Sequence, residues 1–278
     1  MKKDRNMIIQ AIRSFEGYED FIAELAADPA SSDPHFTFDK DNLYRSMERQ
    51  DEFAFVVLEN GEPAGLFVWL VLPDDRYIEM IVGLTKKEEA FAAMLLHMEN
   101  TYPGFQMDFV LNPSNAAISR PLALRGATFE PEQQKMIHNG SVPGVPTDCV
   151  ELLSEKWARQ YCELHNKETY WTAERILANR DSFRVLLAVA EGRVQGYLDV
   201  TSCHEVNEIY DLFVKPEAAK QGCEAALLAK AVELNRPHQL MVVVDADAEA
   251  EIQLYTAAGF SRMEGQNSIT ASYRAETV

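Results

Sequence analysis

The sequence predicts an α/β protein (α+β in some classification schemes) made of two domains, each a mixed, mostly antiparallel, twisted sheet flanked by helices. Its 278 residues, 47% hydrophobic and 25% charged, are enough for two ordinary cores. A strand hairpin occurs twice in the chain, and the same order of strand-like and helix-like segments surrounds both copies. Strands that alternate with helices in this way indicate a mixed sheet in each half.

The hairpin is the clearest internal repeat. FVVLENGEPAGLF (Phe55–Phe67) and LLAVAEGRVQGYL (Leu186–Leu198) each join an apolar strand to a second strand through a tight turn with glycine. A further glycine marks the entry of the second strand, Gly65 in one copy and Gly196 in the other, an offset of 131 positions. The two halves are therefore expected to share one topology.

The segments around the hairpins support this expectation. Helical segments precede them, YEDFIAELAADP and KDNLYRSMER in the first half, SEKWARQYCELHN and WTAERILAN in the second. The segments that follow are the strands YIEMIVGL and EIYDLFV, the helices KKEEAFAAMLLHMEN and CEAALLAKAVELN, the strands FQMDFVL and QLMVVVD, and short helices ending at Gly126 and Gly259. Closing strands are expected beyond both glycines.

A polar stretch separates the two halves. HNGSVPGVPTD (His138–Asp148) is rich in Gly, Pro and polar residues, which favour turns and extended chain. We therefore expect a domain at residues 1–140, a linker at 141–147 and a second domain at 148–278.

Charge and cysteine content exclude several classes of function. A net charge of -18 and a pI near 4.7 disfavour nucleic acid, because that binding depends on Lys and Arg neutralising phosphates. An acidic surface tolerates cationic small molecules. The four cysteines form no CxxC pair and the six histidines add no ligand spacing, so we expect neither structural zinc nor another metal.

No segment of the sequence is typical of a membrane protein. No stretch reaches the roughly 18 to 20 uninterrupted apolar residues that a membrane span needs, and MKKDRNMIIQ runs from charges into a short strand rather than a signal core. A cytoplasmic protein is expected. The oligomeric state does not follow from the sequence.

The most informative motif is VKPEAAKQGCEAALL (Val214–Leu228), which lies between a strand-like run and an amphipathic helix. A strand, a short turn with glycine and a helix can cradle a pyrophosphate, because backbone N–H groups and the helix dipole then converge on it. The glycine in this stretch is Gly222.

This motif resembles the acetyl-CoA turn of the GNAT superfamily of N-acetyltransferases. IQLYTAAGF (Ile252–Phe260) is similar to a later family helix that ends in a tyrosine and a Gly-Phe pair, and the resemblance covers nearly all of Cys149–Arg274. The first half resembles the family in element order but weakly in motif. The chain is identified on this basis as a tandem GNAT-like protein, with a degenerate first domain and a second domain that keeps a residual acetyl-CoA turn.

The resemblance implies which residues would bind acetyl-CoA. The family turn, Gln or Arg, two residues, Gly, one residue, then Gly or Ala, falls on Ala219, Gly222 and Glu224, so one position of three matches. A carboxylate at Glu224 would repel a phosphate ~4 Å away by about 1 kcal/mol in water. A glutamate in a first helical turn is ordinarily just a favourable partner for the helix dipole. The expected cofactor-binding residues are Leu212, Phe213 and Val214 for the pantetheine, and Lys220, Gln221, Gly222, Cys223 and Glu224 around the pyrophosphate.

Two residues are candidates for the chemistry. Tyr255 stands four residues before Gly259, where a family tyrosine assists the departing thiolate as a proton donor. Glu208 lies near the place of a family glutamate that acts as base. Strand alternation puts Glu208 and Tyr210 on one face and Asp211 on the other, unless a bulge intervenes.

The first half lacks the corresponding features. Its tyrosine position falls on Leu122, and TKKEEAF, which follows IVGL, has no glycine turn, although Asn115 matches an asparagine often found in the family. We interpret the first domain as structural, or as one wall of a substrate cleft.

Two classes of function remain open. The first is an acetyl-CoA-dependent N-acetyltransferase that acts through the C-terminal domain on a primary amine of a small molecule or peptide. The second is a catalytically silent GNAT-like protein that binds a small ligand or a protein partner. Gly222 supports the first class, whereas Ala219 and Glu224 support the second.

Overall fold

The chain folds into two compact units. The computed structural model describes residues 7–28, 30–37, 43, 46–141 and 144–275. The N-terminal unit comprises Met1–Gln133 with Glu264–Val278, and the C-terminal unit comprises Gln134–Met263. Each unit contains one seven-stranded sheet. β4–β5 and β11–β12 pair in parallel, whereas the hairpins β2–β3 and β9–β10 and the strands next to them pair antiparallel.

The N-terminal sheet has the strand order β1-β2-β3-β4-β5-β14-β6. Its strands are β1 (Met7–Ile12), β2 (Glu52–Glu59), β3 (Glu62–Leu72), β4 (Tyr77–Thr85), β5 (Gln106–Leu111), β6 (Thr128–Phe129) and β14 (Ile269–Arg274). Its helices are α1 (Glu19–Ala26), α3 (Glu88–Thr101) and α4 (Ala116–Leu124), with 3-10 turns at Pro34–Thr37 and Ser46–Glu48. Half of the positions of the helix expected over KDNLYRSMER lie outside the described residues.

The C-terminal sheet has the order β13-β7-β12-β11-β10-β9-β8. Its strands are β7 (Gln133–His138), β8 (Val150–Leu152), β9 (Phe183–Ala190), β10 (Arg193–Thr201), β11 (Val206–Val214), β12 (Gln239–Asp245) and β13 (Phe260–Arg262). Its helices are α5 (Glu155–Leu164), α6 (Ala173–Ala178), α7 (Pro216–Ala219), α8 (Cys223–Asn235) and α9 (Glu249–Ala257).

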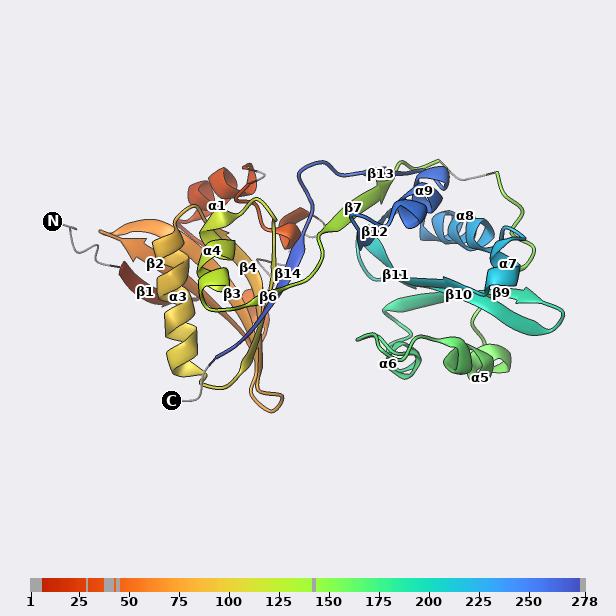
Figure 1. The fold of residues 1–278 in the computed structure, drawn as a ribbon, viewed down its shortest axis with the longest axis horizontal. Coiled ribbons are helices and arrows are strands. Elements are labelled where there is room, and N and C mark those ends of the chain that lie inside the picture. Colours follow the sequence, from red (N-terminus) through yellow and green to blue (C-terminus); the bar gives the residue numbers. More distant parts are fainter. Residues whose placement is uncertain (1–6, 29, 38–42, 44–45, 142–143, 276–278) are drawn as a thin grey trace. The chain divides into compact units, whose positions relative to one another are not determined.

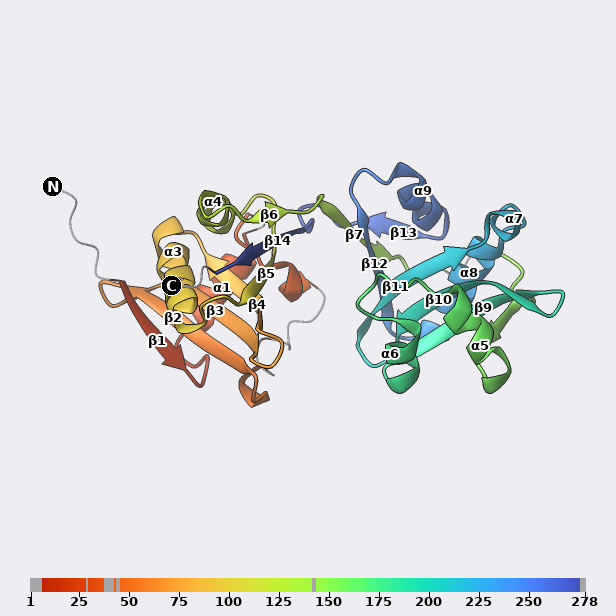
Figure 2. The same ribbon diagram turned by 60° about the horizontal axis from the view of Figure 1, so that its bottom comes forward.

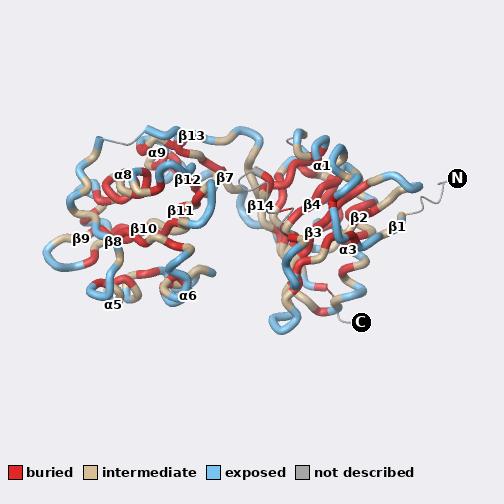
Figure 3. Tube along the Cα trace, turned by 180° about the vertical axis from the view of Figure 1, so that it is seen from behind, coloured by how far each residue is buried: buried red, intermediate tan, exposed pale blue. Residues whose placement is uncertain are grey.

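Helices cover both faces of the C-terminal sheet (Figure 1). One core lies against α8 and α9 and includes Leu198, Ile209 and Leu227. The other lies against α5 and α6 and includes Trp157 and Tyr197. Buried residues follow the strands and the sides of the helices that face them, as Figure 3 shows. The two faces matter for function because each carries a different set of side chains.

The repeated hairpin is confirmed in backbone detail. Both turns have two successive residues with positive φ, Asn60 (55°) and Gly61 (91°) in one, Glu191 (50°) and Gly192 (71°) in the other. Two-residue turns with positive φ match the natural twist of paired strands. The predicted fold class and its duplication are therefore correct.

The compact units are divided differently from the bounds expected at 1–140, 141–147 and 148–278. β7, which precedes the polar stretch, pairs with β13 in the C-terminal sheet, whereas β14 at the end of the chain pairs with β5 in the N-terminal sheet. Each half thus contributes its closing strand to the other unit. The repeat predicts the order of elements, but hydrogen bonding between strands decides to which sheet a segment belongs.

Among the described residues, no helix has the length and apolar character required to cross a bilayer.

Candidate active site

The central strands of the C-terminal sheet separate from one another. β11 and β12 pair in parallel only from Val206↔Gln239 to Ile209↔Val242, although β11 continues to Val214 and β12 to Asp245. The last five residues of β11 therefore have no ladder on the β12 side, which leaves a wedge between the two strands.

A β-bulge marks the start of this wedge. β10 pairs Asp199 with Asp211 and Val200 with Ile209, so Tyr210 is the extra residue. A bulge bends its strand and changes the alternation of side chains. Tyr210 packs with the core on the α5 and α6 side, and Asp211 lies on the same side, within hydrogen-bonding distance of Tyr197. The bulge therefore places Tyr210 and Asp211 on one face of the sheet, whereas strict strand alternation would put them on opposite faces.

The free edge of β11 presents backbone donors to the wedge. Lys215 N–H donates to the carbonyl oxygen of Gln195 on β10 at 2.8 Å. Because donors along an antiparallel strand alternate in direction, the N–H groups of Leu212 and Val214 point away from β10. An extended ligand in the wedge could bind these groups as an added strand would.

In the N-terminal unit, side chains occupy the space beside the corresponding edge of β4. There the β4–β5 ladder also stops early, at Met80↔Phe109, and Gly83 occupies the position of Leu212. Gly83 N–H donates to Asp33 Oδ2 at 2.7 Å, and an added Cβ on Gly83 would lie 2.5 Å from the Met80 side chain. Side chains of the same unit thus fill the space where an extended ligand would bind.

The predicted phosphate turn follows β11 directly (Figure 2). The expected short turn contains the one-turn helix α7, after which Gly222 adopts φ 81° and ψ 18° and starts α8. An L residue is strained at such a φ, which explains the glycine. Apart from the adjacent backbone, no heavy atom lies within 4 Å of an ideal Cβ at Gly222. The first N–H groups of α8, at Cys223, Glu224 and Ala225, have no intrahelical partner. This open helix start fits a diphosphate.

The residues predicted around the turn differ in exposure. Lys220, Gln221 and Gly222 are exposed, Cys223 is buried and Glu224 is half-buried. On the free edge of β11, Leu212 is half-buried, Phe213 is exposed and Val214 is buried. The turn and the free edge are continuous along the chain, so one elongated ligand could contact both.

Tyr255, the predicted proton donor, lies on α9 and is 5% exposed. Its ring meets Phe260 edge to face at 5.4 Å between centroids. Burial raises the pKa of the phenol above its ordinary value, and the charges of Glu251, Asp211 and Glu224 raise it further. The phenol therefore stays neutral, can donate a hydrogen bond, and lies close enough to Asp211 and Glu224 to sense both charges.

Glu208, the predicted base, is half-buried within the part of β11 where the ladder to β12 is intact. Its own N–H donates to Thr201 Oγ1 at 2.8 Å. Lys135 on β7 lies within its electrostatic reach, although Lys135 belongs to the first half of the sequence. The exchange of β7 thus brings a cation to the strand of the candidate base.

Lys135 gives a testable pH dependence. Burial lowers its pKa to about 8, while the charge of Glu208 acts in the opposite direction. The ordinary pKa is 10.5, so between pH 8 and 10.5 the unfolded chain binds the extra proton and the folded chain gains stability as the pH rises. Relative to Lys135→Met, the wild type is expected to gain at most about 1.4 kcal/mol per pH unit in this window. Urea unfolding of both proteins from about pH 7 to about pH 10 checks this, and parallel curves would contradict it.

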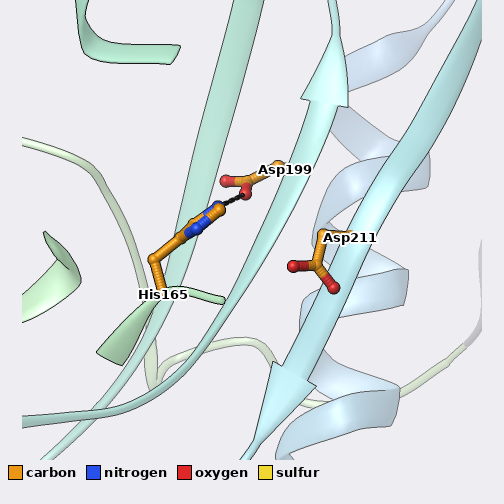
Figure 4. A group of neighbouring side chains, drawn as sticks. All are labelled: His165, Asp199 and Asp211. Atoms are coloured by element: carbon orange, nitrogen blue, oxygen red, sulfur yellow. Dashed lines mark hydrogen bonds and ion pairs between the residues drawn. The ribbon is translucent and has the colours of Figure 1, made fainter. Parts of the chain in front are cut away.

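A buried hydrogen-bond network lies beside the bulge. His165, just after α5, is hydrogen-bonded through Nε2 to Asp199 Oδ2 at 2.9 Å. Tyr161 Oη donates to Asp199 Oδ1 at 2.9 Å, and Tyr197 Oη donates to Asp211 Oδ2 at 2.7 Å. Figure 4 shows His165, Asp199 and Asp211 directed toward one another from three segments, and one ligand atom from each lies within 4.8 Å of the others.

The buried pair of His165 and Asp199 holds a proton tightly. Burial raises the pKa of Asp199, against the opposing effect of its hydrogen bond with His165. The pKa of His165 is also raised, because the hydrogen bonds to Asp199 and the Asn166 carbonyl oxygen, with the charges of Asp199 and Asp211, outweigh burial. The folded pair thus holds a proton more firmly than the two groups do apart.

Sequence reasoning missed most of this network. It placed Asp211 only by strand alternation, on the face opposite Glu208, and it did not single out the other members, Tyr161, His165, Tyr197 and Asp199. The available signal was Asp199 itself, which lies between Leu198 and Val200 in the run YLDV. A carboxylate at such a position is rarely buried unless it is paired.

Comparisons with known proteins agree with the fold. Residues 148–260 match the family model described as the acetyltransferase (GNAT) family. No curated protein matches the chain.

Solved structures match over almost the full chain. A tandem GNAT protein from the clavulanic acid biosynthesis pathway aligns with TM-score 0.60 and 14% identity, over 98% of this chain and 100% of its own. A GCN5-related N-acetyltransferase from Sphaerobacter thermophilus aligns with TM-score 0.69 and 15% identity, over 99% and 97%. A GNAT-family acetyltransferase from Colwellia psychrerythraea aligns with TM-score 0.56 and 11% identity, over 97% and 100%.

The fold and the family match together place the chain among proteins with the GNAT fold. Its C-terminal unit carries a GNAT acetyltransferase domain at residues 148–260, and the whole chain has the fold of a tandem GNAT protein.

Proposed function

We propose that the C-terminal unit transfers the acetyl group of acetyl-CoA to a primary amine of a small molecule or peptide, by direct attack of the amine on the thioester. The observation that carries the proposal is the continuity of the free β11 edge with the open start of α8. Leu212–Val214 can hold the pantetheine through their backbone, and Lys220–Glu224 can surround the pyrophosphate. The bound cosubstrate supplies an acetyl group activated as a thioester.

The residues of the chain supply positioning and proton handling. Tyr255 can donate a hydrogen bond where negative charge develops on the leaving sulfur, because its phenol is neutral and near the wedge. A carboxylate of β11 can take a proton from the incoming amine, and the sequence favours Glu208 for this role. These two roles act from opposite faces of the sheet, near the place where β11 and β12 no longer pair.

A silent, ligand-binding protein is the alternative, and two residues in the turn favour it. Ala219 offers no polar side chain, and Glu224 brings a carboxylate to the helix start where a pyrophosphate would lie. Glu224 is the sharper test, because its charge can be removed without changing the backbone.

Acetyl-CoA is expected to raise the melting temperature of the wild type, and Glu224→Ala is expected to bind acetyl-CoA about fivefold more tightly. The gain reflects the loss of a repulsion of about 1 kcal/mol. A ligand present at 100 times its dissociation constant adds about 2.7 kcal/mol to stability, which a thermal shift detects readily.

Glu233→Ala serves as the matched control, because it removes the same charge from an exposed position near the other end of α8. Equal affinity in both variants would mean that the pyrophosphate does not meet the start of α8. No thermal shift in any of the three proteins, with no amine acetylated, would favour the silent alternative.

A further inference from the structure

Asp211 lies at the opening between the two strands, on the face of the sheet that carries α5 and α6. The β11–β12 ladder stops at Ile209, so Asp211 stands beside the wedge, next to Leu212. Glu208, in contrast, lies where the ladder is intact. Tyr255 senses the charge of Asp211 from the α8 and α9 side of the sheet. A reacting group in the wedge would therefore have Tyr255 on one side and Asp211 on the other.

The side chains around Asp211 carry a net negative charge. His165 is the one cationic side chain in the cluster with Asp199 and Asp211, and it is hydrogen-bonded to Asp199. The Asp211 carboxylate accepts a hydrogen bond from the neutral Tyr197 hydroxyl. Two carboxylates that share one imidazolium carry a net charge of about -1, which suits an ammonium group. Glu208 already has Lys135 within electrostatic reach.

We propose that Asp211, rather than Glu208, binds the protonated amine and accepts its proton, and that His165 and Asp199 position this carboxylate. The inference rests on the proposed function and names its substrate class, a cationic primary amine that approaches from the α5 and α6 face. Tyr197, which donates to Asp211, pairs its ring with that of the exposed Phe213, and aromatic rings near a carboxylate also favour a cation.

The transfer balances with these groups alone. Asp211 takes one proton from the ammonium, which frees the nitrogen lone pair. The nitrogen then bonds to the acyl carbon, the carbon–sulfur bond breaks and its electron pair goes to sulfur. Tyr255 gives its proton to that sulfur and regains one from the nitrogen, so the products are the amide, the free thiol and the proton on Asp211.

Asp211→Asn is the decisive variant, because an amide oxygen can still accept the Tyr197 hydrogen bond while it cannot take a proton. We expect turnover to fall by roughly 10²- to 10⁴-fold, with an unchanged thermal shift from acetyl-CoA. Tyramine, glucosamine and spermidine serve as acceptors, with release of the free thiol as the readout. Glu205→Gln, an exposed neighbour of β11, is the charge-matched control and should keep wild-type turnover.

Binding of the amine alone provides a readout that needs no turnover. Calorimetry with the best acceptor of the three, without acetyl-CoA, should show about 10- to 100-fold weaker binding to Asp211→Asn, as expected for loss of one charged hydrogen bond.

Two His165 variants test the positioning role. His165→Ala removes the partner of Asp199, whereas the side-chain amide in His165→Gln can still donate a hydrogen bond to Asp199. We expect kcat to fall in His165→Ala while the thermal shift from acetyl-CoA stays unchanged, and to recover in part in His165→Gln. A lower melting temperature with wild-type kcat in both variants would show that His165 is only structural.

Three results would overturn the inference. The first is that Asp211→Asn keeps wild-type turnover and amine affinity, or that turnover falls strongly in Glu208→Gln but not in Asp211→Asn. The second is a thermal shift with Mg²⁺ or Zn²⁺ that Asp211→Asn abolishes, since the cluster would then be a metal site. The third is a wild type with neither an acetyl-CoA shift nor turnover, which would also remove the proposed function. A wild type that has both, with an unaffected Asp211→Asn, removes only the inference.

Discussion

Tyr255→Phe is expected to lower turnover by roughly 10²- to 10⁴-fold while affinity for acetyl-CoA stays nearly the same. The change keeps the ring, and with it the edge-to-face contact with Phe260, but removes the hydroxyl. Because the phenol is neutral over the whole physiological range, its function at the leaving sulfur requires a donated proton that phenylalanine cannot supply. Steady-state acetylation of the same three amines, with thermal shifts by acetyl-CoA, measures both quantities.

A purely structural Tyr255 would give a different result. Loss of a buried hydroxyl hydrogen bond costs about 1 kcal/mol of stability and need not change turnover. Tyr170→Phe, at a tyrosine that is 66% exposed, provides the matched control for the chemical change itself. Normal turnover in Tyr255→Phe, together with a lower melting temperature, would exclude its role as proton donor.

The sequence predicts the repeated architecture because the signals are local. Turn glycines, alternating apolar positions and helical periodicity all act within a few residues. These signals located the hairpins, the glycine at the start of α8 and the helix of Tyr255. The exchange of β7 and β14 depends on pairing between segments more than 100 residues apart, and no local pattern distinguishes the exchanged from the unexchanged arrangement.

The candidate site shows the same division. Gly222 is visible in the sequence, because a left-handed turn before a helix requires a residue without a side chain. The side chains near the wedge are harder to predict, because the bulge at Tyr210 moves Asp211 to the other face. His165 and Asp199 are 34 positions apart and meet only in the folded chain. Tertiary contacts, rather than motif spacing, assemble this part of the site.

Asp199→Ala is expected to reduce the free energy of unfolding by about 3 to 5 kcal/mol, the usual cost of removing one partner of a buried ion pair. Asp199 is fully buried and accepts hydrogen bonds from both His165 and Tyr161. Its removal leaves a buried imidazole and a buried hydroxyl without their acceptor. Urea unfolding measures the loss, and Asp181→Ala, at an exposed carboxylate of the same unit, should change stability by no more than about 0.5 kcal/mol.

A double-mutant cycle separates the pair from its surroundings. His165→Ala removes the other partner, so the combined variant should be less destabilised than the sum of the single variants by about 0.5 to 3 kcal/mol. The coupling should also depend on pH. Because the folded pKa of His165 is raised above 6.5, the stability it contributes is fully present below pH 6.5 and is lost as the pH rises through the folded value. A cycle measured below pH 6.5 should thus give a larger coupling than one measured well above it, and additive variants at both pH values would show that the imidazole and the carboxylate do not act as a pair.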